Sequence, residues 1–236
     1  DDAITSDVVE TFTYTVKDAA GNSTTATLAI TVTPVNDAPV NAVPGAQTTA
    51  EDTAKVISGL SIADVDAGSG TETVTLTASH GTLSVLTGTG VTLTGSGTAS
   101  VTLSGTVSAI NALLATTNAV TYTPAANYNG SDTISMTTND GGNTGAGGAK
   151  TDTDTIAITI TSVNDAPVGV ADTASATEAG GVANGTAGTN PAGNVLTNDT
   201  DIDVGDTLSV KDIRTGTAGT VTAVTAGTTS ANGQSL

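Results

Sequence analysis

The chain has 236 residues, with 23 acidic residues against five basic ones, and its formal net charge is −18. A nucleic-acid partner is excluded, because binding to a phosphate backbone needs Lys and Arg to displace counterions. The absence of cysteine excludes disulfides and thiolate metal sites, and no run of about 18 apolar residues predicts a membrane span. The sequence starts at Asp1 in the middle of a pattern, so we expect a segment of a longer protein.

Short segments in which aliphatic or aromatic residues alternate with Thr, Ser or Ala recur along the chain. This alternation predicts strands with one buried face. In chain order the predicted strands cover residues 12–16, 28–32, 74–76, 83–85, 91–93, 101–103, 120–122, 134–136 and 156–160. Gly, Asn and Asp separate them at short intervals, as in β-sandwiches. Residues 109–114 lack alternation and predict a short helical turn, so the predicted fold class is all-β.

The sequence also repeats itself, which indicates tandem units. The segment Val35–Val40 (VNDAPV) returns unchanged at Val163–Val168. The proline in each copy removes a backbone donor and restricts the residue before it, which predicts a stiff junction rather than a loose linker. The segments that precede the two copies also align: residues 10–14 with 132–136, Asp18 with Asp140, and residues 28–32 with 156–160.

These junctions divide the chain into three predicted segments. Residues 1–35 are the last strands of one repeat, residues 36–165 are a complete repeat, and residues 166–236 begin another. The first and third segments together come to about 100 residues, the size of one Ig-like sandwich. The two ends could therefore be complementary parts of one domain type.

The junctions resemble those of tandem bacterial cadherin-like and VCBS repeats, which occur in large secreted adhesins, often of the RTX type. Residues 177–181 and 193–206 resemble the start of a VCBS repeat, and residues 12–18 resemble its end. Residues 122–132 resemble a motif common in such adhesin repeats. The resemblance covers essentially the whole chain. It implies tandem Ig-like or cadherin-like β-sandwiches in series, calcium at the junctions, and a secreted or bacterial cell-surface location.

Acidic residues gather in groups, which favours Ca²⁺, a cation that prefers about six to eight hard oxygen ligands. The densest group is Asp199, Asp201, Asp203 and Asp206, whose carboxylates repel one another unless a cation binds. Asp64 and Asp66 form a weaker group, with Glu51 upstream. The other predicted ligands are the junction pairs, two turn aspartates and one glutamate: Asn36, Asp37, Asn164, Asp165, Asp18, Asp140 and Glu178.

The set resembles cadherins, in which a linker Asn-Asp, a later Asp-X-Asp and an upstream Glu share interdomain calcium. The alternative is that Asp and Asn serve only as turn formers. That alternative stays open above all for Glu51, Glu178, Asp18 and Asp140.

No acid, base and nucleophile set can be assembled, so we predict that the chain is not an enzyme. The single histidine, His80, lies in a turn signature between two predicted strands. Residues 141–149 are rich in glycine but lack the Lys-Ser/Thr of a phosphate loop, and they predict a flexible hairpin insertion. The aromatic residues Phe12, Tyr14, Tyr122 and Tyr128 are predicted to pack in cores.

The main hypothesis is a calcium-stiffened spacer or stalk within a bacterial adhesin, whose partners are neighbouring repeats of the same chain. Two alternatives stay open. The chain could form an extracellular fibre with other copies of itself by strand complementation between its incomplete terminal repeats. It could instead be a calcium-dependent module that binds a surface glycan or a peptide or protein ligand.

Overall fold

The computed structural model describes residues 4–142, 144–189, 192–213 and 222–223. The predicted segments 1–35 and 166–236 therefore lie partly outside the described residues. The chain divides into two compact units: unit 1 spans residues 1–163, and unit 2 spans residues 164–236. The division falls within the second VNDAPV segment.

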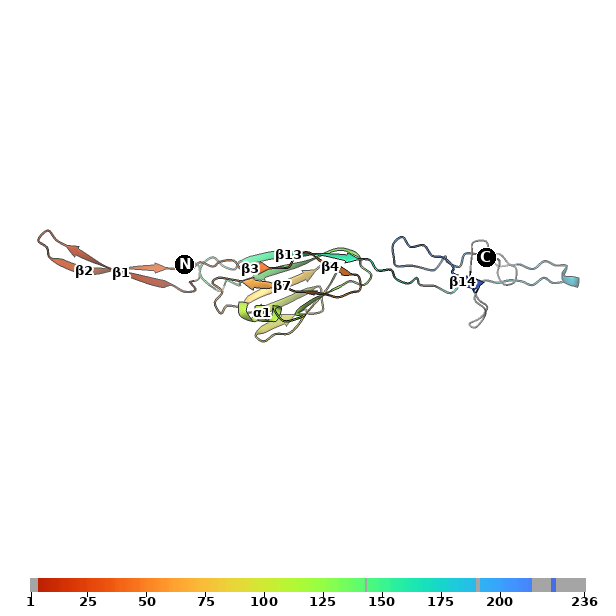
Figure 1. Ribbon diagram of the computed structural model, residues 1–236, viewed down its shortest axis with the longest axis horizontal. Coiled ribbons are helices and arrows are strands. Elements are labelled where there is room, and N and C mark those ends of the chain that lie inside the picture. Colours follow the sequence, from red (N-terminus) through yellow and green to blue (C-terminus); the bar gives the residue numbers. More distant parts are fainter. Residues whose placement is uncertain (1–3, 143, 190–191, 214–221, 224–236) are drawn as a thin grey trace. The chain divides into compact units, whose positions relative to one another are not determined.

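Unit 1 consists of strands joined by short loops and one short helix (Figure 1). The first strands are β1 (Val8–Lys17), β2 (Ser23–Val32), β3 (Val40–Ala42), β4 (Gln47–Ala50), β5 (Lys55–Ile57) and β6 (Ser61–Ala63). The later elements are β7 (Glu72–Ala78), β8 (Gly81–Val85), β9 (Val91–Thr94), β10 (Ser100–Gly105), α1 (Val107–Leu114), β11 (Val120–Pro124), β12 (Gly130–Asn139) and β13 (Thr151–Thr161). All nine predicted strands lie within these elements, and the all-β prediction is confirmed.

Two sheets enclose the core of unit 1. The larger sheet has the order β4-β13-β12-β7-β10-β9, and the smaller has the order β5-β11-β8. All neighbours are antiparallel except β4 and β13, which run parallel with Ile158 opposite Gln47. β3 and β6 form a separate pair beside them, and β1 and β2 form another.

β7 illustrates how the sequence sets this arrangement. Val74, Leu76 and Ala78 are buried, while the threonines between them are half-buried, because successive side chains of a strand point to opposite faces. Glu72 is the first residue of the strand and lies on the same inward face. The alternation therefore also buries a carboxylate.

Helix α1 is where the sequence predicts a helical turn. The Thr106 hydroxyl caps its first turn by accepting a hydrogen bond from the Ala109 amide at 3.2 Å. Ile110, Leu113 and Leu114 are buried in the core. Asn111 fastens the helix to β6, since its side chain donates to the Ile62 carbonyl at 2.7 Å and accepts from the Ile62 amide at 2.9 Å.

The aromatic residues follow the core prediction only in part. Tyr122 is fully buried, and Tyr128 packs against the core and stacks on His80 with ring centroids 4.2 Å apart. The prediction is wrong for Phe12 and Tyr14, which are 53% and 51% exposed on the β1–β2 hairpin. Alternation identifies the apolar face of a strand, but no other described strand of this chain pairs with the hairpin.

Unit 2 contains little regular structure among its described residues. It has a 3-10 turn at Val182–Asn184 and the short pair β14 (Asp212–Ile213) and β15 (Thr222–Ala223). Isolated bridges join Val168 to Thr200 and Thr177 to Thr189. No side chain whose burial is described in this unit is fully buried.

The helices in the described parts of the chain are too short to span a membrane.

Candidate metal centres

Three segments meet at the end of unit 1 where the chain enters the sheets. They are the junction after β2, the loop between β6 and β7, and the turn between β12 and β13. The Asn36 side chain donates to Asp140 Oδ2 at 2.6 Å and to the Gly148 carbonyl at 3.0 Å. The Asp37 amide donates to Asp66 Oδ2 at 3.2 Å. We call the polar set at this end the first junction cluster: Asn36, Asp37, Asp64, Asp66, Glu72 and Asp140.

The Asp-Val-Asp loop of this cluster holds itself in shape through its own backbone. Asp64 Oδ1 accepts hydrogen bonds from the amides of Asp66 and Ala67, each at 3.1 Å. The Thr144 hydroxyl donates to the Asp66 carbonyl at 2.8 Å and ties the loop to the segment after β12. Asp64 Oδ1 is used in this way and Asp66 Oδ2 accepts from the Asp37 amide, so each aspartate has one oxygen left without a partner among the described residues.

Glu72 is the central residue of the cluster, and the sequence did not single it out. Its side chain is 0% exposed, and neither carboxylate oxygen has a hydrogen-bond partner among the described residues. Asp64 Oδ2 and Asp66 Oδ1 are buried without a partner in the same described part of the chain. An unpartnered buried polar group costs about 1–3 kcal/mol, and more when it is charged. Four such oxygens in one place therefore call for a ligand.

The electrostatics of the cluster agree with this geometry. Burial, followed by the charges of Asp64, Asp140 and Asp66, raises the pKa of Glu72 to about 7. Burial, reinforced by Asp66, raises the pKa of Asp64. Burial also acts to raise the pKa of Asp140, but hydrogen bonds from the Lys150 and Gly142 amides and from Asn36 lower it overall. A divalent cation would stabilise the ionised form of all of them.

The donor set fits a hard cation. The five carboxylates and the one amide side chain of the cluster supply oxygen ligands, the type that Ca²⁺ prefers. The cluster has neither a histidine nor a thiolate, the nitrogen and sulfur ligands that zinc commonly takes in proteins.

Five of the predicted ligands lie in this cluster: Asn36, Asp37, Asp64, Asp66 and Asp140. Glu51 does not, because β4 carries it beside the last residues of β13, at the opposite end of the sheet from Asp140. Glu51 is 3% exposed, and its oxygens accept from the Val163 amide at 2.6 Å and from Asn129 Nδ2 at 3.4 Å. A strand the length of β13 spans about 33 Å, which keeps Glu51 well away from Asp64.

Asp18 also lies apart from the other predicted ligands. It occupies the exposed turn between β1 and β2, at the opposite end of the hairpin from the Asn36 junction. Its oxygens accept from the Asn22 amide and from Asn22 Nδ2, both at 2.8 Å, and these hydrogen bonds lower the pKa of Asp18. The contacts are those of an ordinary Asx turn.

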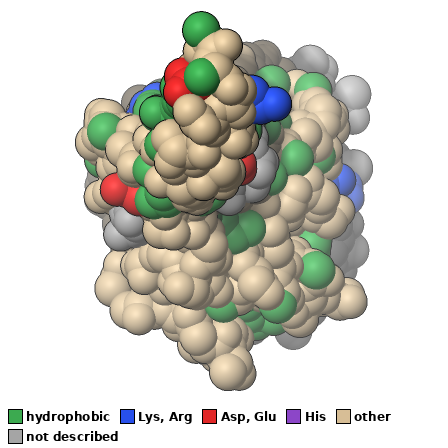
Figure 2. All heavy atoms as spheres, turned by 90° about the vertical axis from the view of Figure 1, so that its left-hand side faces the viewer, with side chains coloured by type: hydrophobic (Ala, Val, Ile, Leu, Met, Phe, Trp, Pro, Cys, Tyr) green, Lys and Arg blue, Asp and Glu red, His purple; other side chains and the backbone are tan. Residues whose placement is uncertain are grey.

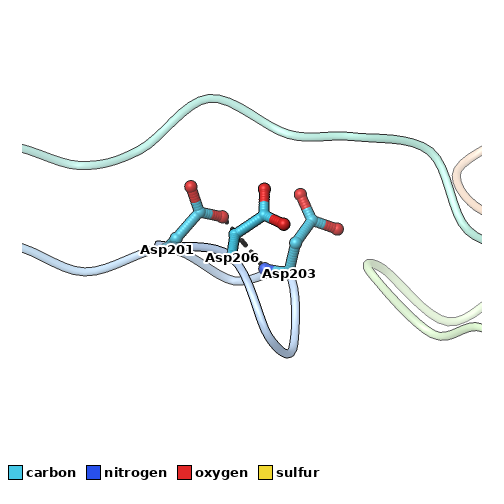
Figure 3. Close-up of side chains that lie close together, drawn as sticks. All are labelled: Asp201, Asp203 and Asp206. Atoms are coloured by element: carbon cyan, nitrogen blue, oxygen red, sulfur yellow. Dashed lines mark hydrogen bonds between the residues drawn. The ribbon is translucent and has the colours of Figure 1, made fainter. Parts of the chain in front are cut away.

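A second acidic group lies in unit 2. Carboxylate oxygens of Asp201, Asp203 and Asp206 come within 4.8 Å of one another, and Figure 3 shows the three side chains pointing to the same side of the loop. Asp199 is not part of it, since its Oδ1 accepts from the Val170 amide at 2.7 Å. The remaining predicted ligands here are Asn164, whose side chain donates to the Asp165 carbonyl at 2.8 Å, and Glu178, which is exposed.

The two junctions make the same backbone contacts. The Asp165 amide donates to Asp203 Oδ2 at 2.6 Å, as the Asp37 amide does to Asp66. The Asp203 amide donates to Asp201 Oδ1 at 3.0 Å, as the Asp66 amide does to Asp64. The bridge between Val168 and Thr200 likewise matches the pairing of Val40 with Ala63.

This correspondence identifies the signal that could have predicted Glu72. Asp206 comes directly before the alternating segment Thr207–Val210, and Glu72 comes directly before the alternating residues 73–76 of β7. In both places an acidic residue follows an Asp-X-Asp pair and opens a strand-like pattern. Glu72 is therefore the counterpart of Asp206 in the first junction cluster.

Catalytic geometry is not assembled around His80. Its Nδ1 lies 3.6 Å from Asp132, whose oxygens already accept hydrogen bonds from the Tyr122 hydroxyl and from three backbone amides. A pocket of about 570 Å³ is lined by residues 56–61 and 114–119, none of which is acidic, basic or histidine.

The sequence matches no family model and no curated protein, so the functional argument rests on the geometry of the two acidic groups.

Proposed function

We propose that this chain is a calcium-stiffened repeat segment, which serves as a spacer or stalk in a bacterial surface or secreted adhesin and is built from Ig-like, cadherin-like units. One observation carries the proposal: Glu72 is fully buried beside three other carboxylates, and both of its oxygens lack a hydrogen-bond partner among the described residues. Without a cation this arrangement is destabilising, whereas with Ca²⁺ it is a set of ligands.

Stiffening follows from where the ligands come from. Asn36 and Asp37 belong to the segment that enters the sheets, Asp64 and Asp66 to a loop, and Asp140 to a turn between two long strands. An ion bound by all three ties the entering segment to the folded strands. Pro39 restricts the same segment further. Removal of the ion would leave the segment held only by protein hydrogen bonds, such as those of Asn36 and Asp37 and the one that the Ala146 amide donates to the Pro34 carbonyl.

The expected size of the effect is that of an extracellular calcium module. Such modules bind with a Kd of about 10⁻⁴–10⁻³ M. At roughly ten to a hundred times Kd, one site adds about 1.4–2.7 kcal/mol to the free energy of unfolding. That is a sizeable share of the roughly 5–15 kcal/mol that holds a typical domain folded.

The test is calorimetric titration of the metal-free chain with Ca²⁺, together with melting of unit 1. We expect Glu72→Gln to weaken Ca²⁺ binding at the first junction cluster by about tenfold or more and to remove the calcium-dependent rise in melting temperature. Glu10→Gln is the matched control, because Glu10 is exposed on β1 and lies outside both acidic groups. Equal calcium responses in the Glu72→Gln variant and the wild type would refute the proposal.

A further inference from the structure

The turn between β12 and β13 is longer than the reversal of the chain requires. In the aligned β1–β2 hairpin, Asp18 is followed by residues 19–22 before β2 begins. The aligned Asp140 is followed by residues 141–150 before β13 begins. Both aspartates accept backbone hydrogen bonds from their own turn. Since the shorter turn already reverses the chain, the additional residues of the longer turn have another role.

Residues 144–148 of this turn, which we call the strap, pair with the segment that enters the sheets. Ala146 forms a parallel bridge with Val35. The Ala146 amide donates to the Pro34 carbonyl at 3.1 Å, and the Ala146 carbonyl accepts from the Asn36 amide at 2.8 Å. Hydrogen bonds that flank the bridged residue in this way are those of a parallel sheet. The strap therefore holds the entering segment by its backbone.

The strap also contacts the first junction cluster near both of its ends. Thr144 is buried, and its hydroxyl donates to the Asp66 carbonyl at 2.8 Å. The Gly148 carbonyl accepts from the Asn36 side chain at 3.0 Å, and the same side chain donates to Asp140 at 2.6 Å. The strap therefore joins the three segments that supply the cluster, which are the entering segment, the loop and the turn.

Glycine at position 145 allows this close approach. Gly145 has a φ of 68°, in the left-handed region. A Cβ atom there would lie 2.7 Å from the carbonyl carbon and oxygen of Pro34 and 2.9 Å from the Val35 nitrogen. These are backbone atoms, which cannot swing aside as the end of a side chain can. A larger residue at position 145 would therefore push the strap and the entering segment apart.

The side chains beside the strap are covered by protein. Four members of the cluster are buried: Asn36, Asp66, Glu72 and Asp140. Figure 2 faces the hairpin side of the molecule and shows few acidic side chains at the surface. The Asn36 side chain reaches Asp140 from the entering segment, and the strap holds that segment through Ala146. The closed strap therefore positions Asn36 before any ion binds.

We propose that the strap sets the calcium affinity of the first junction cluster by holding the entering segment in place. The inference rests on the calcium site proposed above. When the strap opens, the loop and the turn keep their carboxylates, but Asn36 and Asp37 lose the backbone pairing that holds them nearby. A site that is complete for only part of the time binds its ion more weakly in proportion to that time. Linkage is reciprocal, so bound Ca²⁺ favours the closed strap by the same factor.

Hydrogen exchange and calorimetry of the full chain test this role. In the metal-free protein we expect Gly145→Ala to speed exchange of the Asn36 and Ala146 amides by about tenfold or more. Calcium titration of this variant should give a dissociation constant about tenfold higher. Gly21→Ala is the matched control, because Gly21 also has a positive φ but a Cβ there would meet nothing within 4 Å. The control should leave both measurements at their wild-type values.

A second variant leaves the backbone of the strap unchanged. Thr144→Val removes the hydroxyl that donates to the Asp66 carbonyl and keeps the shape of the side chain. We expect the calcium dissociation constant to rise by about two- to tenfold. Thr144→Ser keeps the hydroxyl and should restore most of the affinity. These two variants decide the question even if Gly145→Ala does not fold.

The outcomes separate this proposal from the calcium site itself. Equal calcium affinity in Gly145→Ala, Thr144→Val and the wild type would overturn the role of the strap and leave the calcium site standing. Unchanged exchange of the Asn36 amide in Gly145→Ala would overturn it as well, because the strap would then not hold the entering segment. A wild-type chain that binds no calcium would refute the calcium site, and with it the effect on affinity, whatever the exchange rates are.

Discussion

The two ends of unit 1 both bury carboxylates, but they stabilise them in opposite ways. At the end near Glu51, each oxygen of Asp132 accepts two hydrogen bonds, from the Ser79 and Thr133 amides and from the His80 amide and the Tyr122 hydroxyl. At the end near Asn36, both oxygens of Glu72 lack a described partner. The protein itself stabilises the first carboxylate, while no described hydrogen bond stabilises the second, which on our proposal is stabilised by a cation. A buried acid whose hydrogen bonds are missing is therefore a stronger indication of a metal site than a buried acid alone.

The pKa values express the same difference. Burial acts to raise the pKa of Asp132, but the Tyr122 hydroxyl and the three amides lower it overall. The same Tyr122 has its pKa raised, by burial first and then by its hydrogen bond to Asp132. Glu72 has no such donors, and its pKa rises to about 7. Four experiments test this difference between the two ends.

The largest loss of unfolding free energy is expected at the end of unit 1 that contains Asp132. Asp132→Ala leaves the Tyr122 hydroxyl and three backbone amides without their acceptor, and should cost about 3–5 kcal/mol of unfolding free energy. Urea unfolding measured with and without Ca²⁺ should give the same loss, because no cation takes part at this end. A loss that Ca²⁺ restores would contradict the comparison.

The second largest loss of unfolding free energy is expected when the cation is removed. Chelation should lower the unfolding free energy of unit 1 by about 1.4–2.7 kcal/mol, and the same decrement should appear in the Asp132→Ala background, since distant sites are additive. Chemical denaturation of both proteins with and without chelator measures the two decrements. Unequal decrements would mean that the two ends are coupled.

Glu72 gives a pH dependence whose sign can be stated. Its pKa in the folded chain is about 7, against an ordinary value of 4.5, so the folded state holds the extra proton between these pH values. Metal-free stability should therefore fall as pH rises from about 4.5 to about 7. Melting curves across this range should show the slope in the wild type and a much smaller one in Glu72→Gln, where the raised pKa of Asp64 still contributes with the same sign. Asp132 and Asp140 have lowered pKa values, so their contributions to the free energy of unfolding change only at pH values below this range.

The smallest loss of unfolding free energy is expected from substitution of Glu51. Glu51→Gln should cost about 0.5–1.5 kcal/mol, because it weakens the hydrogen bond from the Val163 amide while it keeps an acceptor there. Calcium affinity of the first junction cluster should not change, since Glu51 lies at the other end of the sheet. A calorimetric titration in which this variant lost that affinity would place Glu51 among the ligands.

The sequence predicted the parts of unit 1 that depend on local pattern. Alternation located nine of the strands, and its absence at residues 109–114 located the capped helix, whereas the short strands β3 to β6 were not predicted. The division between the two units falls within the second VNDAPV segment. The Asp-X-Asp pairs, which the sequence predicts as metal ligands, lie in turns whose own backbone holds one oxygen of Asp64 and of Asp201.

What the sequence could not predict depends on contacts between distant segments. Glu51 stands close to Asp64 in the sequence, yet the parallel pairing of β4 with β13 carries it to the other end of unit 1. Glu72 looks like an ordinary strand residue until the burial of its face is known. Phe12 and Tyr14 have the alternation of core residues, but alternation does not say which strands cover them.

The pairing of β4 with β13 also determines how unit 1 would respond to being pulled. The two strands run in the same direction, and four residue pairs join them, from Ile158 with Gln47 to Thr161 with Ala50. A force applied at residues 36 and 163 slides one strand along the other and loads their hydrogen bonds together, since these bonds lie across the strands. The β1–β2 hairpin, pulled at Val8 and Val32, would open one pair at a time. In the described part of unit 1, mechanical resistance therefore resides in the four residue pairs that join β4 to β13, while the longer β1–β2 hairpin yields first.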